Sequence, residues 1–250
     1  MIIREDLENA AVLRLAHGKV SALDIELCQA LSRELEQVAI GPAPALIITG
    51  TGSTFSAGVD LFRVLAGGAT YLNEFLPAME AFFNALVMFP KPAVAAVNGH
   101  AIAGGCIITA ACDYRVMAEG AARIGVPELV VGVPFPPLPF EIMRARLSPP
   151  HFRELVLTGR TVQPAEALPL ALVDELAPPD VLMTRAQHAA GRLLAIPPAT
   201  FTLTKRAFTD PILERVQRAT SFNGGVLEAW ESPAVQDRIR AYVERTVGRK

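Results

Sequence analysis

The chain has 250 residues, of which 51% are hydrophobic and 19% charged, and 23 basic against 25 acidic side chains give a formal charge of −2. Disordered chains are poorer in apolar residues, so this composition predicts a folded globular protein. The balanced charge gives no reason to expect a nucleic-acid partner, which would require a basic face or stripe.

A mean hydropathy of +0.34 raises the question of a membrane span, and the most apolar stretch is residues 93–112. Asn98 and His100 interrupt this stretch, so we expect it to be buried in a core or between subunits rather than to cross a membrane. Charged residues at positions 4–6 stand where a signal peptide would need an apolar segment. We therefore expect a cytoplasmic protein.

The three cysteines, Cys28, Cys106 and Cys112, form an odd set without CxxC spacing. This pattern argues against a disulfide framework and against a zinc site, and we expect no bound metal. Buried thiols in a reducing compartment are the simplest interpretation.

In the first half of the chain, short apolar runs alternate with stretches of helical periodicity. The predicted strands are residues 11–15, 45–49, 93–98 and 114–118, and the predicted helices are residues 23–39, 72–89 and 105–112. Strand, turn and helix in this order are typical of an α/β protein.

From Pro149 onward the periodicity is helical. We expect helices over residues 151–158, 164–170, 181–195, 199–208 and 211–231, with prolines at helix starts and in turns. A boundary between residues 190 and 200 divides the chain into an α/β core, residues 1–195, and a helical C-terminal region, residues 196–250. Since these helices are apolar enough to require a partner surface, we expect a homo-oligomer.

Several common catalytic motifs are absent from the sequence. The segment from Gly50 to Phe55 begins like a dinucleotide-binding fingerprint, but Phe55 occupies the position of the third glycine. There is no GxxxxGK[ST] phosphate loop, no GxSxG elbow and no HExxH motif. Without these motifs, the sequence is not expected to be a P-loop nucleotide-binding protein, a serine hydrolase or a zinc peptidase.

Two glycine-bearing loops, residues 55–61 (FSAGVDL) and 98–106 (NGHAIAGGC), each follow a predicted strand. Glycine at a helix N-terminus allows close approach of a ligand, and the free N–H groups there attract developing negative charge. Two such loops facing one another could aim two N–H donors at one oxygen, as an oxyanion hole does. The alternative is that the glycines only permit tight turns.

A single carboxylate, Glu128, lies between apolar residues in the segment 125–132 (GVPELVVG). Apolar surroundings disfavour the charged form, which raises the pKa toward the range useful for proton transfer. The alternative is a glutamate facing solvent at a helix start after Pro127.

Together with residues 112–115 (CDYR), these three segments resemble the crotonase superfamily of enoyl-CoA hydratases and isomerases in their order and spacing. The resemblance extends from about residue 10 to about residue 235. It implies a crotonase-type α/β fold, a spiral of repeated ββα units with a helical C-terminal trimerisation region, and assembly as a homotrimer or hexamer.

The resemblance also implies an acyl-CoA thioester substrate, with coenzyme A as part of the substrate and no separate cofactor. The backbone N–H groups of Val59 and Gly104 would stabilise the thioester enolate. The remaining substrate and coenzyme A contacts would come from Lys19, Ser21, Ala22, Leu23, Ala57, Gly58, Asp60, Leu61, Gly105 and Phe135. Lys19 could meet a phosphate or simply be solvated.

The carboxylates narrow the choice of reaction. Hydratases that the chain resembles typically use two glutamates, whereas here Ile107 occupies the first position and Glu128 the second. A 1,3-proton shift needs one base, which takes a proton from C2 and returns it to C4. The pattern is thus similar to the Δ3,Δ2-enoyl-CoA isomerase branch, with Glu128 as base and acid.

Three alternatives stay open: a 2-enoyl-CoA hydratase, another crotonase-type lyase or hydrolase, and a non-catalytic acyl-CoA-binding protein. The segment 133–141 (VPFPPLPFE) replaces the glycine-rich stretch that many hydratases carry. It leaves open whether Phe135 lines the acyl pocket and whether Glu141 enters it. Residues 63–70 are expected to form a mobile lid or a helix edge.

Overall fold

The computed structural model describes residues 1–247, with the side chains of residues 220–223 and 247 excepted. The strands are β1 (Ile2–Asp6), β2 (Ala11–Leu15), β3 (Leu46–Thr49), β4 (Thr54–Ser56), β5 (Ala93–Val97), β6 (His100–Ile102), β7 (Tyr114–Ala118), β8 (Ile124–Gly125), β9 (Thr161–Val162) and β10 (Glu175–Ala177). The helices are α1 (Ile25–Ile40), α2 (Leu61–Val87), α3 (Gly104–Ala111), α4 (Glu128–Val131), α5 (Pro137–Arg146), α6 (Pro149–Thr158), α7 (Pro164–Ala167), the 3-10 helix η1 (Pro179–Val181), α8 (Leu182–Leu194), α9 (Pro198–Arg218), α10 (Thr220–Glu231) and α11 (Pro233–Val247).

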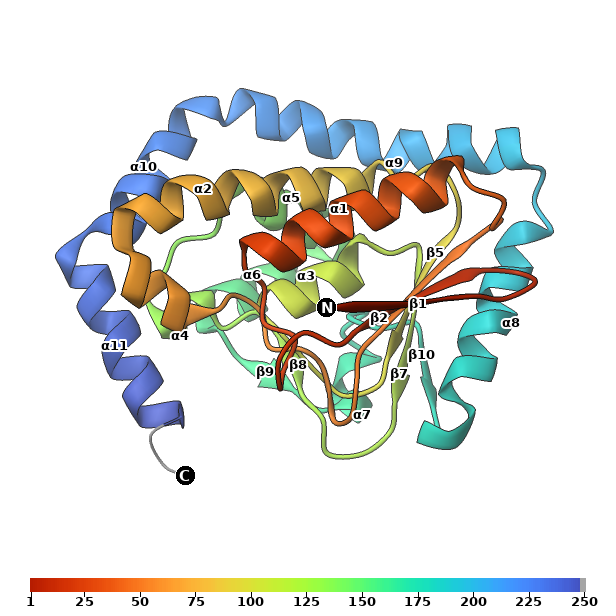
Figure 1. The fold of residues 1–250 in the computed structure, drawn as a ribbon, viewed down its shortest axis with the longest axis horizontal. Helices are drawn as coiled ribbons and strands as arrows, with labels where there is room; N and C mark the ends of the chain where they lie inside the picture. The colour runs from red at the N-terminus through yellow and green to blue at the C-terminus, as the bar shows by residue number, and fades with distance from the viewer. Residues whose placement is uncertain (248–250) are drawn as a thin grey trace.

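The repeating unit is two strands followed by a helix: β3-β4-α2, then β5-β6-α3, then β7-β8-α4. The first strand of each unit joins a six-stranded sheet of order β1-β2-β3-β5-β7-β10, and the second joins a four-stranded sheet of order β4-β6-β8-β9. Within both sheets the strands of the repeats pair in parallel. The chain therefore winds as a spiral of ββα units, as the sequence predicts (Figure 1).

The two faces of the six-stranded sheet pack against different helices (Figure 1). Because neighbouring side chains on a strand point to opposite faces, Leu13 and Ile48 enter the core with α1, α2 and α3, while Val12 and Ile47 face α8. The helix α8 presents mainly alanines to the sheet, which lets it lie close to the strands. Both faces are thus buried, as parallel sheets require.

The C-terminal helices close one end of the molecule. Helix α9 packs along α5, and α10 and α11 pack on α2 (Figure 1). A separate hydrophobic cluster joins α2, the end of α4 and these last helices through Leu72, Val131, Val226, Trp230 and Ile239. The expected division between residues 195 and 196 falls in the connection between α8 and α9, and it stays a prediction.

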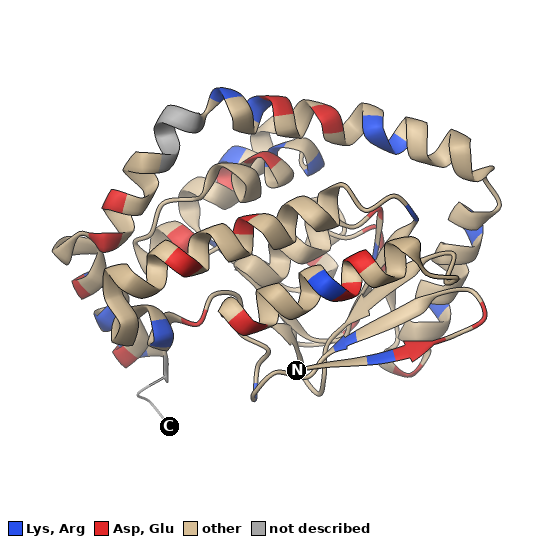
Figure 2. Ribbon diagram, turned by 45° about the horizontal axis from the view of Figure 1, so that its top comes forward, with Lys and Arg blue, Asp and Glu red and all other residues tan. Residues whose placement is uncertain are grey.

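Residues 93–112 include β5, β6 and the whole of α3, and they are largely buried in the core. No helix in the described part of the chain is long and apolar enough to cross a membrane. The three cysteines are buried and free. Figure 2 shows acidic and basic residues interspersed over the helices.

Three expectations about the helices differ from the structure. The helix expected from residue 72 lies in the second part of α2, and a first part begins already at Leu61, so residues 63–70 belong to α2. The Asp60 carboxylate caps this start by accepting from the N–H groups of Phe62 and Arg63, and non-helical backbone angles at Gly68 (φ 54°, ψ −142°) form a kink between the two parts.

Pro211 does not begin a helix but lies inside α9, and the stretch expected as one helix over residues 211–231 divides after Arg218. The helices α5 and α11 and the strands β1, β4, β6, β8, β9 and β10 were not expected from the sequence. All of these strands except β1 have two or three residues each, too few to show a period of two.

Replacing Gly105 with alanine should destabilise the fold by about 1–3 kcal/mol, as overpacking a core does. A Cβ at this position would lie 2.3 Å from the backbone carbonyl oxygen of Ser56, which cannot move without disturbing β4. Urea unfolding measures the loss.

Gly191→Ala on α8 is the matched control, because its Cβ would meet no atom within 4 Å. It should gain about 0.5–1 kcal/mol from the better helix propensity of alanine. Equal stability of the two variants would contradict the close packing of α3 on β4.

Candidate active site

The two glycine-bearing loops lie in contact at the edge of the four-stranded sheet. A Cβ added to Gly58 would lie 2.6 Å from the Ala103 Cβ, 2.7 Å from the Ile102 carbonyl oxygen and 3.0 Å from the Gly104 nitrogen. Gly58 also has a φ of 81°, which side chains other than glycine rarely adopt. The contact of the loops therefore depends on glycine at this position.

The hydrogen bonds around Leu23 orient the first loop. Leu23 N–H donates to the Gly58 carbonyl (2.7 Å), and Asp60 N–H donates to the Leu23 carbonyl (2.9 Å), which forms a parallel bridge between Leu23 and Val59. In such a bridge, the N–H of the residue between the two bonded peptides points to the other side. The Val59 N–H is thus directed away from Leu23.

The second donor is the N–H of Gly104. Gly104 is the first residue of α3, and the first N–H groups of a helix have no intrahelical acceptor. Ala103 before it has a positive φ of 51°, a strained conformation that sets the direction in which α3 begins. Val59 and Gly104 line the same cavity, so both donors are available to one ligand.

Buried groups behind the loops hold this arrangement. A Cβ on Gly104 would lie 2.5 Å from Leu23 Cδ1, so Leu23 packs directly behind the second donor. The Ser56 hydroxyl donates to the Ser21 carbonyl (2.8 Å) and accepts from Gly58 N–H (3.3 Å). Sequence reasoning missed Ser56, since nothing in the pattern FSAG separates it from an ordinary strand residue.

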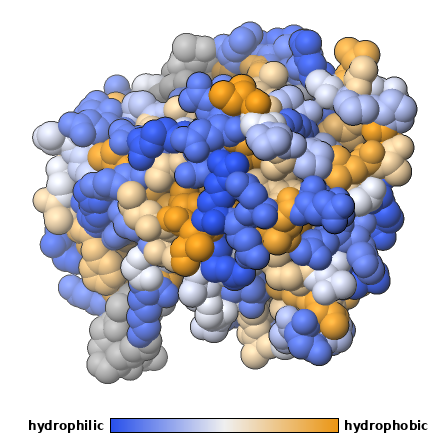
Figure 3. All heavy atoms as spheres, turned by 45° about the vertical axis from the view of Figure 1, so that its right-hand side comes forward, coloured by the Kyte–Doolittle hydropathy of each residue, from blue (hydrophilic) through white to orange (hydrophobic). Residues whose placement is uncertain are grey.

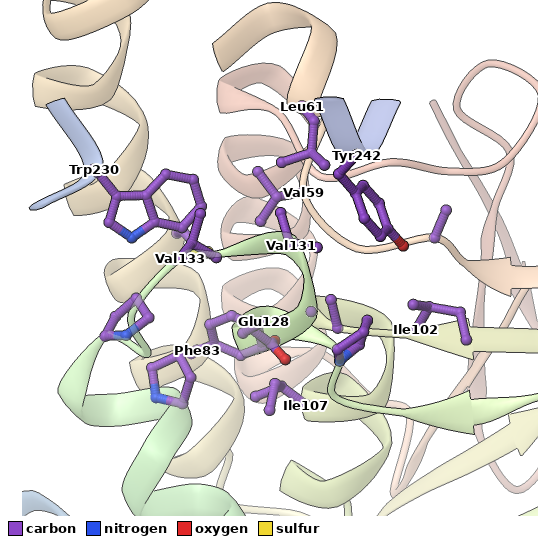
Figure 4. Close-up of a pocket in the computed structure, with 17 residues that line it drawn as sticks. Val59, Leu61, Phe83, Ile102, Ile107, Glu128, Val131, Val133, Trp230 and Tyr242 are labelled. Carbon is purple, nitrogen blue, oxygen red and sulfur yellow. The ribbon is translucent and has the colours of Figure 1, made fainter. Parts of the chain in front are cut away.

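The cavity has a volume of about 80 Å³ and is mostly apolar. Figure 4 shows its walls: Val59 and Leu61 on one side, Phe83 and Ile107 below, and Trp230 and Tyr242 from the C-terminal helices. Among the described residues, Glu128 is the single carboxylate that lines it.

Glu128 is the first residue of α4, directly after Pro127, and the residue as a whole is partly exposed, but its side chain lines the cavity. Its Oε2 is buried and has no hydrogen-bond partner. Burial in apolar surroundings raises the pKa of Glu128 from its ordinary value of 4.5 to about 8, against a smaller opposing effect of its own backbone N–H. The solvated interpretation of this residue is therefore wrong.

The remaining predicted contacts divide into two groups. The segment from Lys19 to Leu23 lies against the first loop, because Ala57 N–H donates to the Val20 carbonyl (3.0 Å). Lys19 is exposed, whereas Ser21 is buried with a φ of 46°. Ala22, the next residue, is partly exposed, and Ala57 and Leu61 line the cavity.

Other predicted residues support the site or lie outside it. Asp60 caps α2, and Gly105 packs on Ser56. Phe135 is buried in the core against Phe140, with ring centroids 6.0 Å apart, and does not line the cavity. Pro136 and Pro139 line it instead.

Glu141 is buried outside the cavity, where it forms an ion pair with Arg144 (3.3 Å). Four residues that line the cavity were not identified from the sequence: Met79, Phe83, Trp230 and Tyr242. Their apolar spacing on helices is the same as that of core residues, so no sequence signal separates them.

Comparisons with known proteins agree with this geometry. The Enoyl-CoA hydratase/isomerase family model matches residues 6–248. A putative enoyl-CoA hydratase from Thermus thermophilus is 33% identical, with 89% of each chain covered. The mitochondrial enoyl-CoA delta isomerase 1 of Mus musculus is 27% identical, with 100% of this chain and 88% of the relative covered.

The crystal structure of human mitochondrial delta3-delta2-enoyl-CoA isomerase superposes with a TM-score of 0.95 at 24% identity, covering 100% of this chain and 99% of the human one. This likeness confirms the fold. With the family match over nearly the whole chain, it leads to one conclusion: the chain is an enzyme of the enoyl-CoA hydratase/isomerase family, within the crotonase superfamily.

Proposed function

We propose that this enzyme converts 3-enoyl-CoA to 2-enoyl-CoA thioesters by a proton shift through Glu128. The observation that carries the proposal is one buried carboxylate in an otherwise apolar cavity that also contains two backbone N–H donors. This set of groups matches the needs of a 1,3-proton shift.

The reaction takes two steps. The Glu128 carboxylate removes a proton from C2, and the electron pair moves into the thioester carbonyl to give a dienolate. The N–H groups of Val59 and Gly104 stabilise the negative oxygen, as preorganised donors do in a water-excluded site. Protonated Glu128 then returns the proton to C4, which leaves a double bond between C2 and C3.

Ile107 supports isomerisation over hydration. It lines the cavity at the position where the hydratases that the sequence resembles carry a glutamate, and it is buried. Its side chain neither orients a water molecule nor transfers a proton. It also adds to the apolar surroundings that raise the pKa of Glu128.

Coenzyme A would extend from the thioester along the segment from Lys19 to Leu23, with the exposed Lys19 near a phosphate. Gly58 and Asp60 would complete this wall through their backbone. No cofactor other than the coenzyme A of the substrate is needed for the proton shift, and no metal is needed.

The proposed assembly is a homotrimer or hexamer in the cytoplasm. Leu203 and Phe208 on α9 are 68% and 74% exposed, as side chains of a subunit contact would be in the isolated chain. The space-filling view of one face shows hydrophobic patches between hydrophilic side chains (Figure 3).

Hydration of 2-enoyl-CoA is the second candidate. Tyr242 lines the cavity, and its hydroxyl group could transfer the second proton that hydration requires. The 33% identity to the putative enoyl-CoA hydratase from Thermus thermophilus also supports this candidate. Hydration of crotonyl-CoA, measured beside isomerisation, separates the two, and a Tyr242→Phe variant should then lose hydration alone.

Glu128→Gln should lower kcat for 3-hexenoyl-CoA isomerisation by about a hundredfold or more, because it removes the proton-transfer group while preserving volume. The conversion can be followed by the absorbance of the conjugated 2-enoyl thioester. Binding of hexanoyl-CoA should be retained in the variant. Equal turnover by variant and wild type would exclude Glu128 as the base.

The activity should rise with pH. Because Glu128 must be ionised to take the C2 proton and its pKa is about 8, kcat/KM should increase about tenfold per pH unit below pH 8 and level off above it. Measurement of kcat/KM in a series of buffers from pH 5.5 to 9.5 tests this dependence. A plateau that already begins near pH 5 would contradict the buried, protonated state.

Stability should respond in the opposite direction. Between pH 4.5 and 8 native Glu128 binds a proton that the unfolded chain has lost, so the free energy of unfolding falls as pH rises. Glu128→Gln removes this penalty, and its stability advantage should grow by up to about 1.4 kcal/mol per pH unit over that range. Urea unfolding at pH 5 and pH 8 measures the difference, and Glu36→Gln, an exposed position on α1, controls for loss of charge.

A further inference from the structure

A second cavity lies directly beside the catalytic one. It has a volume of about 180 Å³ and lies between α2, the proline-rich start of α5 and α10. Met79, Pro136 and Pro139 line both cavities, so these three side chains form the wall between them. The two spaces are thus neighbours across one layer of side chains.

Met79 is the movable part of this wall. The proline rings are fixed to the backbone, whereas methionine is unbranched and changes shape by rotation of its side-chain bonds. Met79 is only 3% exposed, so its side chain fills the interior between the cavities and does not point to solvent. Of the three shared wall residues, Met79 is therefore the one whose side chain can move without a change of the backbone.

The second cavity is apolar near the wall and polar at its outer end. Leu72, Leu76, Val226 and Leu227 line its inner part. Asn73 and Glu80 are exposed lining residues and mark the outer end. A flexible apolar chain that enters past Met79 would therefore bury its length before it reaches solvent.

The outer end is held together by a link between helices. The Asn73 side-chain amide donates to the Glu231 carboxylate (3.0 Å), which joins α2 to α10 beside the cavity. Trp230 on α10 lines the catalytic cavity, and Val226, one turn earlier on the same helix, lines the second. Helix α10 thus forms a continuous side of both spaces.

We propose that the second cavity binds the distal part of a long straight acyl chain, with Met79 as the gate between it and the catalytic cavity. The substrate class is acyl-CoA thioesters whose chain extends beyond the catalytic cavity. The inference rests on the proposed function for the position of the thioester, since the chain must begin at the Val59 and Gly104 donors.

Binding of saturated acyl-CoA thioesters tests the inference without turnover. Trp230 is the single tryptophan of the chain and lines the catalytic cavity, so its fluorescence reports occupancy of the site. Wild type is titrated with butanoyl-, hexanoyl-, octanoyl-, decanoyl- and dodecanoyl-CoA. Beyond hexanoyl, affinity should continue to rise by up to about fourfold per methylene, the value for a fully buried CH2 group.

Two variants act on the cavity in opposite ways. Leu227→Phe fills the second cavity and should weaken decanoyl-CoA binding at least tenfold while leaving butanoyl-CoA binding unchanged. Met79→Ala removes the gate and should strengthen decanoyl-CoA binding relative to butanoyl-CoA. Leu157→Phe, at a 61% exposed leucine that lines neither cavity, is the matched control and should leave both affinities unchanged.

The outcomes separate the two proposals. Affinity that stops rising at hexanoyl-CoA, or equal weakening of short and long chains by Leu227→Phe, overturns the second cavity as the chain site and leaves the proposed function intact. Absence of binding to every acyl-CoA overturns both. If Met79→Ala does not fold, the ratio of decanoyl to butanoyl affinity in Leu227→Phe decides alone.

Discussion

The close contact between the two loops is the constraint on which the active site depends. Gly58 meets Ala103 and Gly104 at distances that leave no room for a Cβ. The pairing of β4 with β6 brings the loops together, with Thr54 beside His100 and Ser56 beside Ala101. Since the donors are backbone N–H groups, their separation is fixed by the sheet and by this contact, and no side-chain rotamer can change it.

The strain at Ala103 is stabilised by the same sheet. A positive φ at a residue other than glycine costs about 1–3 kcal/mol. Ala103 N–H donates to the Gly125 carbonyl (2.8 Å), and its own carbonyl accepts from Ile107 N–H (3.0 Å), so both peptide groups are held. Gly125 belongs to β8, three residues before Glu128. This hydrogen bond therefore joins the loop before Gly104 to the strand that precedes Glu128.

Much of this site could be predicted from the sequence, because its loops follow strands directly. The glycines of the segments 55–61, 98–106 and 125–132, and Glu128 in the last of them, form patterns within a few residues of one another. The cavity wall formed by Pro136 and Pro139 could not be predicted in the same way. In the segment 133–141, aromatic and proline side chains alternate, and only the packed structure shows that Pro136 and Pro139 face the cavity while Phe135 enters the core.

The start of α2 was missed for a related reason. Gly67 and Gly68 suggest a loop, because glycine in a helix costs stability. Here the helical conformation is interrupted at Gly68, and the Asp60 cap and the packing of Val64 in the C-terminal cluster stabilise the helical part that precedes it. Tertiary contacts, which a local pattern does not contain, decide where this helix begins.

The same C-terminal cluster shows that the cavity and the helical region are one unit. Val131, Val133 and Trp230 belong both to the cluster and to the wall around Glu128. Trp230 N–H donates to the Pro134 carbonyl (3.3 Å), which ties α10 to the segment that follows α4. Without α10 and α11 the carboxylate would lose an apolar wall and gain water, and its pKa would return toward the ordinary value. The proposed oxyanion donors come from the spiral, whereas Trp230 on α10 and Tyr242 on α11 line the cavity around Glu128, so these C-terminal helices form part of the candidate active site.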